Sequence, residues 1–196
     1  MVKVFFCEGI CMDKKNLSIL GIGVLAASHL LGGLINKESR AEEVVRAEPN
    51  ADYIVPGIAL NEFISPHYKV SFKYPRGWSK NPRYEDKYEG ESGFFEVGDF
   101  SGIGENIDEA VNEQINEPYK PYGSNPAVRK FVVDGQPARV IYPSSDQTEF
   151  YKDRETAIVV KYPEPVTIGG KTFDYVVIWA SRDYVPLIMS TLKFLK

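Results

Sequence analysis

The sequence has 196 residues, of which 43% are hydrophobic, and a formal net charge of −4. This length fits one domain with a core large enough to fold without disulfide bonds. Residues 1–41 hold five Lys/Arg and three Asp/Glu, so the rest of the chain carries −6. That charge argues against a nucleic-acid partner, whose phosphates it would repel. Both cysteines, Cys7 and Cys11, lie within residues 1–41. Residues 42–196 contain no cysteine, which excludes a disulfide framework in that part of the chain.

The first predicted element is an apolar segment, residues 17–35, which contains no charged side chain. As a helix rising ~1.5 Å per residue it would span ~28 Å, about the thickness of a hydrocarbon core. Lys14 and Lys15 precede it, which fits a signal peptide cleaved near Ala41 or an uncleaved anchor whose C-terminal side faces outward. Both interpretations stay open, and both place the later residues outside the cytoplasm.

The flanking residues define four predicted segments. Met12 begins a more typical targeting segment than Met1, so residues 1–11 are interpreted as an extension from a start codon assigned too early; either start stays open. Residues 12–41 are then the signal peptide or membrane anchor. Lys, Glu, Arg, Ala and Asn dominate residues 36–56, which predicts a linker that is assigned to residues 42–62, and residues 63–196 form the folded domain.

The first half of this domain is predicted to contain three strands. Apolar and polar residues alternate over residues 68–74, which predicts a half-buried strand, and Trp78 follows a turn and folds back over the sheet. Residues 83–89 are charged enough for an exposed edge strand. Residues 93–100 form a more buried strand, and a turn at 90–93 joins the two in a hairpin.

The second half begins with a helix that Asn106 caps and Pro118 ends. Asp134-Gly135 and Gly169-Gly170 then predict two hairpins. In the second hairpin the alternation places four aromatic or apolar side chains on one face: Phe173, Tyr175, Val177 and Trp179. Apolar residues between 187 and 195 recur at helical spacing, so the chain is expected to end on an amphipathic helix. The predicted fold class is α+β, an antiparallel β-sheet flanked by a few helices and preceded by one N-terminal apolar helix.

Three short motifs resemble known catalytic or nucleotide-binding patterns, and each departs from its pattern. Residues 169–172 (GGKT) resemble the end of a phosphate loop, but Pro165 stands where that loop needs glycine. Residues 102–104 (GIG) resemble a dinucleotide loop, whose third glycine is here Ile107. Residues 190–193 (STLK) match a Ser-x-x-Lys pattern but leave no room for its partner motifs. We therefore predict no catalytic residue.

Metal and cofactor sites are not predicted either. After the apolar segment His67 is the only histidine, so a catalytic triad or a zinc site would depend on it alone. The acidic clusters lack the alternating Asp spacing of a calcium loop, and the simplest interpretation is that they are solvated.

Aromatic residues are the best candidates for ligand binding. Tyr119 and Tyr122, with prolines between and after them, predict a stiff exposed loop that can hold a peptide or a sugar face. Trp78 and Trp179 complete the candidate set. The alternative is that these aromatic side chains only close the end of the core.

Residues 72–78 (FKYPRGW) resemble the turn that ends the first core strand of the PsbP-like family. The hairpin at 134–139 (DGQPAR) and the closing residues 191–194 (TLKF) are similar to the same family plan, so the resemblance covers roughly 63–196. It implies an antiparallel sheet between helices in an exported scaffolding or binding protein. Residues 122–126 and Tyr162-Pro163 also resemble uncharacterised bacterial domains found beside BlaR-type surface sensors. The matched positions form turns and packing contacts, so no functional residue is carried over.

We therefore expect a membrane-tethered or secreted, non-enzymatic domain of a bacterial envelope that binds an envelope protein or a small ligand. The alternative is an envelope hydrolase that uses carboxylate or Ser/Lys chemistry. An enzyme should show titratable groups with perturbed pKa values converging in a pocket, and a binding domain should show an aromatic or apolar surface.

Overall fold

The computed structural model describes residues 45–46, 57–100 and 106–196, which belong to one compact unit, Ala41–Lys196. The predicted apolar helix at 17–35 and the predicted cleavage site at Ala41 lie outside these residues. Within the described ranges, no helix has the length and the apolar character needed to cross a bilayer.

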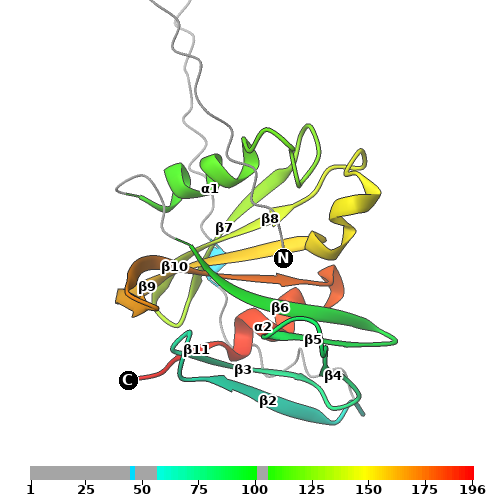
Figure 1. The fold of residues 1–196 in the computed structure, drawn as a ribbon, viewed down its shortest axis with the longest axis vertical. Coiled ribbons are helices and arrows are strands. Elements are labelled where there is room, and N and C mark those ends of the chain that lie inside the picture. Colours follow the sequence, from blue (N-terminus) through cyan, green and yellow to red (C-terminus); the bar gives the residue numbers. More distant parts are fainter. Residues whose placement is uncertain (1–44, 47–56, 101–105) are drawn as a thin grey trace, which may run out of the picture. The chain divides into compact units, whose positions relative to one another are not determined.

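The described residues form two β-sheets and two short α-helices (Figure 1). The larger sheet has eight strands, in the spatial order β1 (Val45–Arg46), β7 (Ala127–Val133), β8 (Gln136–Tyr142), β9 (Thr156–Ile168), β10 (Lys171–Ala180), β6 (Gly93–Phe100), β5 (Lys87–Gly90) and β4 (Ser79–Lys80). The smaller sheet has the order β11 (Lys193–Phe194), β3 (Val70–Pro75) and β2 (Leu60–Ser65). The helices are α1 (Ile107–Ile115) and α2 (Val185–Thr191), and two 3₁₀ turns are η2 (Glu149–Arg154) and η3 (Arg182–Tyr184).

The pairing confirms a mostly antiparallel α+β fold, with one addition that the sequence did not predict. β1 pairs in parallel with β7, and the other described strand pairs are antiparallel. The predicted strand at 68–74 corresponds to β3, which lies in the second sheet rather than in the main one. Residues of the predicted linker 42–62 form β1 and the start of β2.

The eight-stranded sheet buries a separate core on each face. α1 covers one face, where the buried residues are Ile107, Ala110, Val111, Tyr122, Ile141, Ala157, Val159, Tyr175 and Val177. The three-stranded sheet and α2 cover the other face, which carries a larger core rich in aromatic residues. This larger core includes Phe63, Phe72, Tyr74, Trp78, Phe95, Ile158, Ile178 and Ile188. The molecule therefore has three layers.

Both predicted glycine-containing hairpins are confirmed. Asp134 and Gly135 join β7 to β8 with φ angles of 48° and 79°, and Gly169 and Gly170 join β9 to β10 with 56° and 80°. Two consecutive positive φ values are the mark of a type I′ turn, which twists in the same sense as the strands it connects. The predicted turn between β5 and β6 is also present, with Gly90 paired to Gly93.

The predicted common face of β10 is only partly correct. Tyr175, Val177 and Trp179 lie on the α1 side, but Phe173 packs against the opposite core. The pairing of β10 with β9 shifts register between Phe173 and Tyr175. A bulge inserts one extra residue, so the alternation of faces reverses on crossing it.

The predicted edge strand at 83–89 is shorter and is not at the edge. Only Lys87–Gly90 forms β5, and the two residues of β4 pair outside it as the last strand of the sheet. The predicted C-terminal helix also ends early, at Thr191. The Thr191 Oγ1 accepts a hydrogen bond from the backbone N of Lys73 at 3.0 Å, and the chain then extends to form β11 beside β3. These long-range hydrogen bonds outweigh the local helical spacing.

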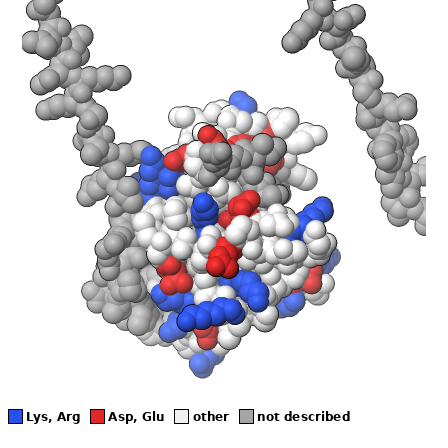
Figure 2. Space-filling view, turned by 90° about the vertical axis from the view of Figure 1, so that its left-hand side faces the viewer, with Lys and Arg blue, Asp and Glu red and all other residues white. Residues whose placement is uncertain are grey.

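Charged side chains are mixed on the face of the molecule seen in Figure 2. There, Lys and Arg lie close to Asp and Glu, without a large area of a single sign. A mixed surface of this kind keeps a domain soluble without attracting a strongly charged partner to that face.

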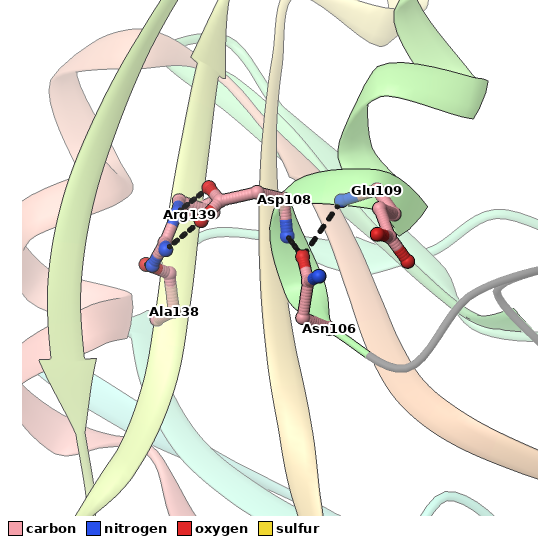
Figure 3. Close-up of polar contacts among 5 residues, drawn as sticks. All are labelled: Asn106, Asp108, Glu109, Ala138 and Arg139. Carbon is pink, nitrogen blue, oxygen red and sulfur yellow. Dashed lines mark hydrogen bonds and ion pairs between the residues drawn. The ribbon is translucent and has the colours of Figure 1, made fainter.

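The predicted cap of α1 is confirmed, and a buried arginine accompanies it (Figure 3). The Asn106 Oδ1 accepts hydrogen bonds from the backbone N of Asp108 at 3.0 Å and of Glu109 at 3.1 Å. These two bonds satisfy N–H groups that the first turn of a helix leaves without partners. The Asp108 carboxylate also accepts two hydrogen bonds from the Arg139 side chain of β8, which attach the start of α1 to the sheet.

Candidate interaction surface

Tyr122 anchors the loop that follows α1. Its side chain is fully buried, and its hydroxyl accepts a hydrogen bond from the Trp179 Nε1 of β10 at 3.0 Å. Buried tyrosine and tryptophan side chains need such a partner because each carries a polar group into an apolar environment. Two of the four predicted ligand-binding residues therefore contact each other, as part of the core under α1.

A second set of hydrogen bonds fixes the same loop to the segment after β8. The Asp146 carboxylate accepts hydrogen bonds from the backbone N of Ser124 at 3.1 Å and from the Ser144 hydroxyl. These bonds from Ser124 and Ser144 hold the pKa of Asp146 well below its ordinary value. The backbone N of Ser144 also donates to the Tyr122 carbonyl oxygen at 3.0 Å.

Glycine is required at the centre of this contact. Gly123 has a φ of +81°, and a Cβ atom there would lie 2.2 Å from the Ser144 Oγ. Both the backbone angle and the space exclude a side chain. The loop that carries Tyr119 and Tyr122 is thus fixed to the segment after β8 by hydrogen bonds that require glycine at position 123.

Gln147 connects this loop to η2. Its Nε2 donates to the carbonyl oxygen of Pro121 at 2.9 Å and to that of Tyr151 at 3.1 Å. Tyr119, two residues before Pro121, is 76% exposed, and Phe150, next to Tyr151, is 82% exposed. These are the two most exposed large hydrophobic side chains in the described part of the chain. We call Tyr119 and Phe150 together the aromatic loop surface.

Sequence reasoning selected Tyr119 but missed Phe150. The available signal was an aromatic pair, Phe150-Tyr151, inside a polar and charged stretch. Such a pair has no periodicity to distinguish an exposed from a buried side chain. The structure separates them, because Tyr151 is half-buried while Phe150 is exposed, with the two ring centroids 5.0 Å apart, edge to face.

Trp78 lies elsewhere, in the core on the opposite face of the large sheet. It is 5% exposed, packs against Tyr184 with ring centroids 4.6 Å apart, and donates from Nε1 to the Ser92 Oγ at 3.0 Å. The four predicted residues therefore do not share one site: Tyr119, Tyr122 and Trp179 lie on the α1 side, and Trp78 does not.

Titratable groups with shifted pKa values gather near the β2–β3 turn. Burial, followed by Asp86 and Asp99, raises the pKa of Tyr68 to about 12. Burial also raises the pKa of Asp99 and that of Tyr162, whose hydroxyl donates to the Tyr68 carbonyl oxygen at 3.0 Å. The raised pKa values extend the pH range over which both tyrosines stay protonated.

One groove adjoins this region. It encloses about 640 Å³ between the β9 residues around Tyr162 and the C-terminal residues around Phe194. Within the described ranges, no group of three or more His, Cys, Asp and Glu side chains has the proximity of a metal site.

Comparisons with known proteins give a similarity at the level of structure. No family model matches the chain, and no curated protein matches it. A solved structure, the cyanobacterial PsbP (CyanoP) of Synechocystis sp. PCC 6803, is similar over 71% of this chain and 95% of its own length, with 12% sequence identity and a TM-score of 0.37. This solved structure is a PsbP protein, and the motifs at 72–78 and 134–139 were compared with the PsbP-like family.

Proposed function

We propose that this chain is a non-enzymatic binding domain of a bacterial envelope, whose aromatic loop surface contacts another envelope protein. The apolar segment 17–35 would hold it at the membrane, or cleavage near Ala41 would release it. We also propose that the domain is a PsbP-like αβα sandwich and that an apolar helix precedes it. The exposure of Tyr119 and Phe150 on two mutually fixed loops is the observation that carries the proposal.

Exposed aromatic side chains on fixed loops suit binding for an energetic reason. Aromatic residues are frequent among the few side chains that dominate interface energies. A loop that is already ordered loses little further conformational entropy when it binds. The Tyr122–Trp179, Asp146 and Gln147 contacts supply this order before any partner arrives. The complementary surface on the partner is expected to be an apolar pocket with a polar rim.

The location outside the cytoplasm rests on the 19 uncharged residues of 17–35. Mass spectrometry of the protein from its native host tests how the segment is processed. A species that begins at Glu42 supports cleavage, and an intact N-terminus in the membrane fraction supports the anchor. A reporter at Lys196 that is active only in the cytosol would contradict both.

Site-specific photo-crosslinking tests the partner surface. The full chain would carry a photoreactive phenylalanine analogue at position 119, 150 or 84 in its native envelope. We expect one discrete adduct from positions 119 and 150 and none from position 84, where Tyr84 is 46% exposed in another part of the molecule. Adducts of equal yield from all three positions would contradict the proposal.

Affinity capture with matched variants provides the second test. Tyr119→Ser together with Phe150→Ser should remove the crosslinked partner from the captured material, and Tyr84→Ser should leave it. All three positions are solvent-exposed, so thermal unfolding of the variants should match that of the original chain. Capture that survives the double substitution would show that the partner contacts a different surface.

A further inference from the structure

Two arginines converge on one tyrosine ring at the end of the large sheet. The Arg129 guanidinium carbon lies 5.4 Å from the centroid of the Tyr142 ring, and that of Arg182 lies 5.2 Å from it. Arg129 belongs to β7, Tyr142 ends β8 and Arg182 begins η3, so three separate elements build this arrangement. It lines a groove of about 760 Å³ that also includes Ser144 and Asp183.

The register of the strands explains why these side chains share a face. Arg129 pairs with Val140, and Tyr142 pairs with Ala127, which places Arg129 and Tyr142 at diagonal positions. Side chains two residues apart on a strand point to the same face, so both lie on the side of Val140 and the larger core. η3 and the start of α2 cover that side and bring in Arg182.

The described residues that line this groove carry two positive charges, on Arg129 and Arg182, and one negative charge, on Asp183. Among the described ion pairs, none involves Arg129 or Arg182. The cation–π contacts with Tyr142 offset part of the repulsion between the two guanidinium groups. An anion in the groove would offset more of it, because a guanidinium group can donate two parallel N–H bonds to an oxyanion.

We infer that this groove binds a carboxylate group of a ligand. A carboxylate matches the planar fork of a guanidinium in both geometry and charge. The local charge of the two arginines and Asp183 is only +1, which suits one negative charge better than the two of a phosphate. The Ser144 hydroxyl already donates to Asp146, and the two arginines are the positively charged donors that line the groove.

Titration with two small anions tests this inference on the full chain in detergent micelles. The readout is the NMR signal of the arginine Nε–H groups, at a constant ionic strength set with sodium chloride. Sodium acetate should shift the signals of Arg129 and Arg182 along a saturating curve, and it should bind more tightly than inorganic phosphate. Tighter binding of phosphate would overturn the carboxylate assignment. A linear shift, or the same shift with chloride alone, would overturn the site.

Three arginine variants and one double aromatic variant complete the test. Arg129→Gln and Arg182→Gln should each weaken acetate binding by about tenfold, because each removes one charge-assisted fork. The matched control is Arg83→Gln, which removes the same charge from an exposed arginine outside the groove. Equal weakening in all three would show a non-specific effect of net charge. Tyr119→Ser with Phe150→Ser should leave acetate binding unchanged, which separates this site from the aromatic loop surface.

Discussion

Arg139 and Asp108 form a two-pronged ion pair that joins the middle of the large sheet to the first turn of α1 (Figure 3). The Arg139 Nε donates to the Asp108 Oδ1 at 2.7 Å, and its Nη2 donates to Oδ2 at 2.8 Å. The Nη1 donates to the Ala138 carbonyl oxygen at 2.9 Å, so each guanidinium nitrogen has a partner although Arg139 is only 8% exposed. Asp108 also lies where a helix N-terminus favours negative charge.

Removal of the Asp108 carboxylate should therefore destabilise the domain more than removal of an ordinary surface side chain would. Asp108→Ala leaves the Arg139 charge buried without its partner, and we expect a loss of about 2 kcal/mol in the free energy of unfolding. The loss stays below that of a fully buried pair because the Asp108 side chain is half exposed. Urea unfolding measures it. Arg139→Met in addition should recover part of the loss, and a simple sum of the two single effects would contradict the coupling.

The same pair predicts how stability depends on pH. The hydrogen bonds from Arg139 lower the pKa of Asp108 below its ordinary value of ~3.9 in the unfolded chain. Its contribution is therefore fully present above about pH 4 and is lost as the pH falls through the lowered folded pKa. Asp108→Asn should flatten the decrease of unfolding free energy in this acid range.

Asp99 provides a control, because its pKa is shifted in the opposite direction from that of Asp108. Burial raises its pKa, so the folded state holds the proton more tightly and the contribution of Asp99 weakens as the pH rises above about 4. Asp99→Asn should remove that decrease at higher pH. Identical pH profiles for the Asp108 and Asp99 variants would contradict both assignments.

The cap of α1 can be tested independently of the ion pair. Asn106→Ala removes the acceptor of two backbone N–H groups and should lower the free energy of unfolding by about 1 kcal/mol. Asn106→Ser should retain most of that stability because serine also caps helices. Asn112→Ala, at an exposed position within the same helix, is the control and should have little effect or a slightly favourable one.

Short-range signals in the sequence determined the elements that were predicted correctly. The turns at Asp134-Gly135 and Gly169-Gly170 depend on two residues each, and the cap at Asn106 depends on its next three neighbours. The early end of α2 could not be predicted in this way. It depends on Thr191 bonding to Lys73, a residue 118 positions away, and no local pattern contains that contact.

The candidate sites show the same division. The sequence indicated a stiff loop with Tyr119 and Tyr122, but the burial of Tyr122 depends on Trp179, 57 residues later. The sequence did not indicate a site at Arg129, Tyr142 and Arg182, because isolated arginine and tyrosine residues form no recognisable motif. Only the packing of η3 over the ends of β7 and β8 makes them one site.

A buried hydroxyl offers a stabilising substitution. Thr156 at the start of β9 is fully buried, and within the described residues its Oγ1 has no hydrogen-bond partner. An unpaired buried hydroxyl costs free energy, and valine has nearly the same shape without that group. Thr156→Val should raise the free energy of unfolding by about 1 kcal/mol, measured by urea unfolding. Thr148→Val, at an exposed position, should not, and a loss of stability in Thr156→Val would show that the hydroxyl has a partner after all.

The turn between β7 and β8 also holds the last strand of the chain. The Asp134 carboxylate accepts hydrogen bonds from the Lys193 Nζ and from the backbone N of Phe194, both at 2.9 Å. Asp134→Asn keeps a residue that tolerates the positive φ of the turn but removes the charge that strengthens both bonds. Hydrogen exchange at the Phe194 amide should then be about tenfold faster.

Lys193→Met separates the two bonds of this attachment. The Lys193 side chain is 61% exposed, so its ion pair with Asp134 should contribute little, and exchange at Phe194 should change less than in Asp134→Asn. The backbone N of Leu195 donates to the Lys69 carbonyl oxygen at 2.8 Å and keeps its own bond in both variants. Faster exchange at Phe194 alone therefore indicates release from Asp134. Equal acceleration at Phe194 and Leu195 would instead mean that β11 detaches from β3 as one unit.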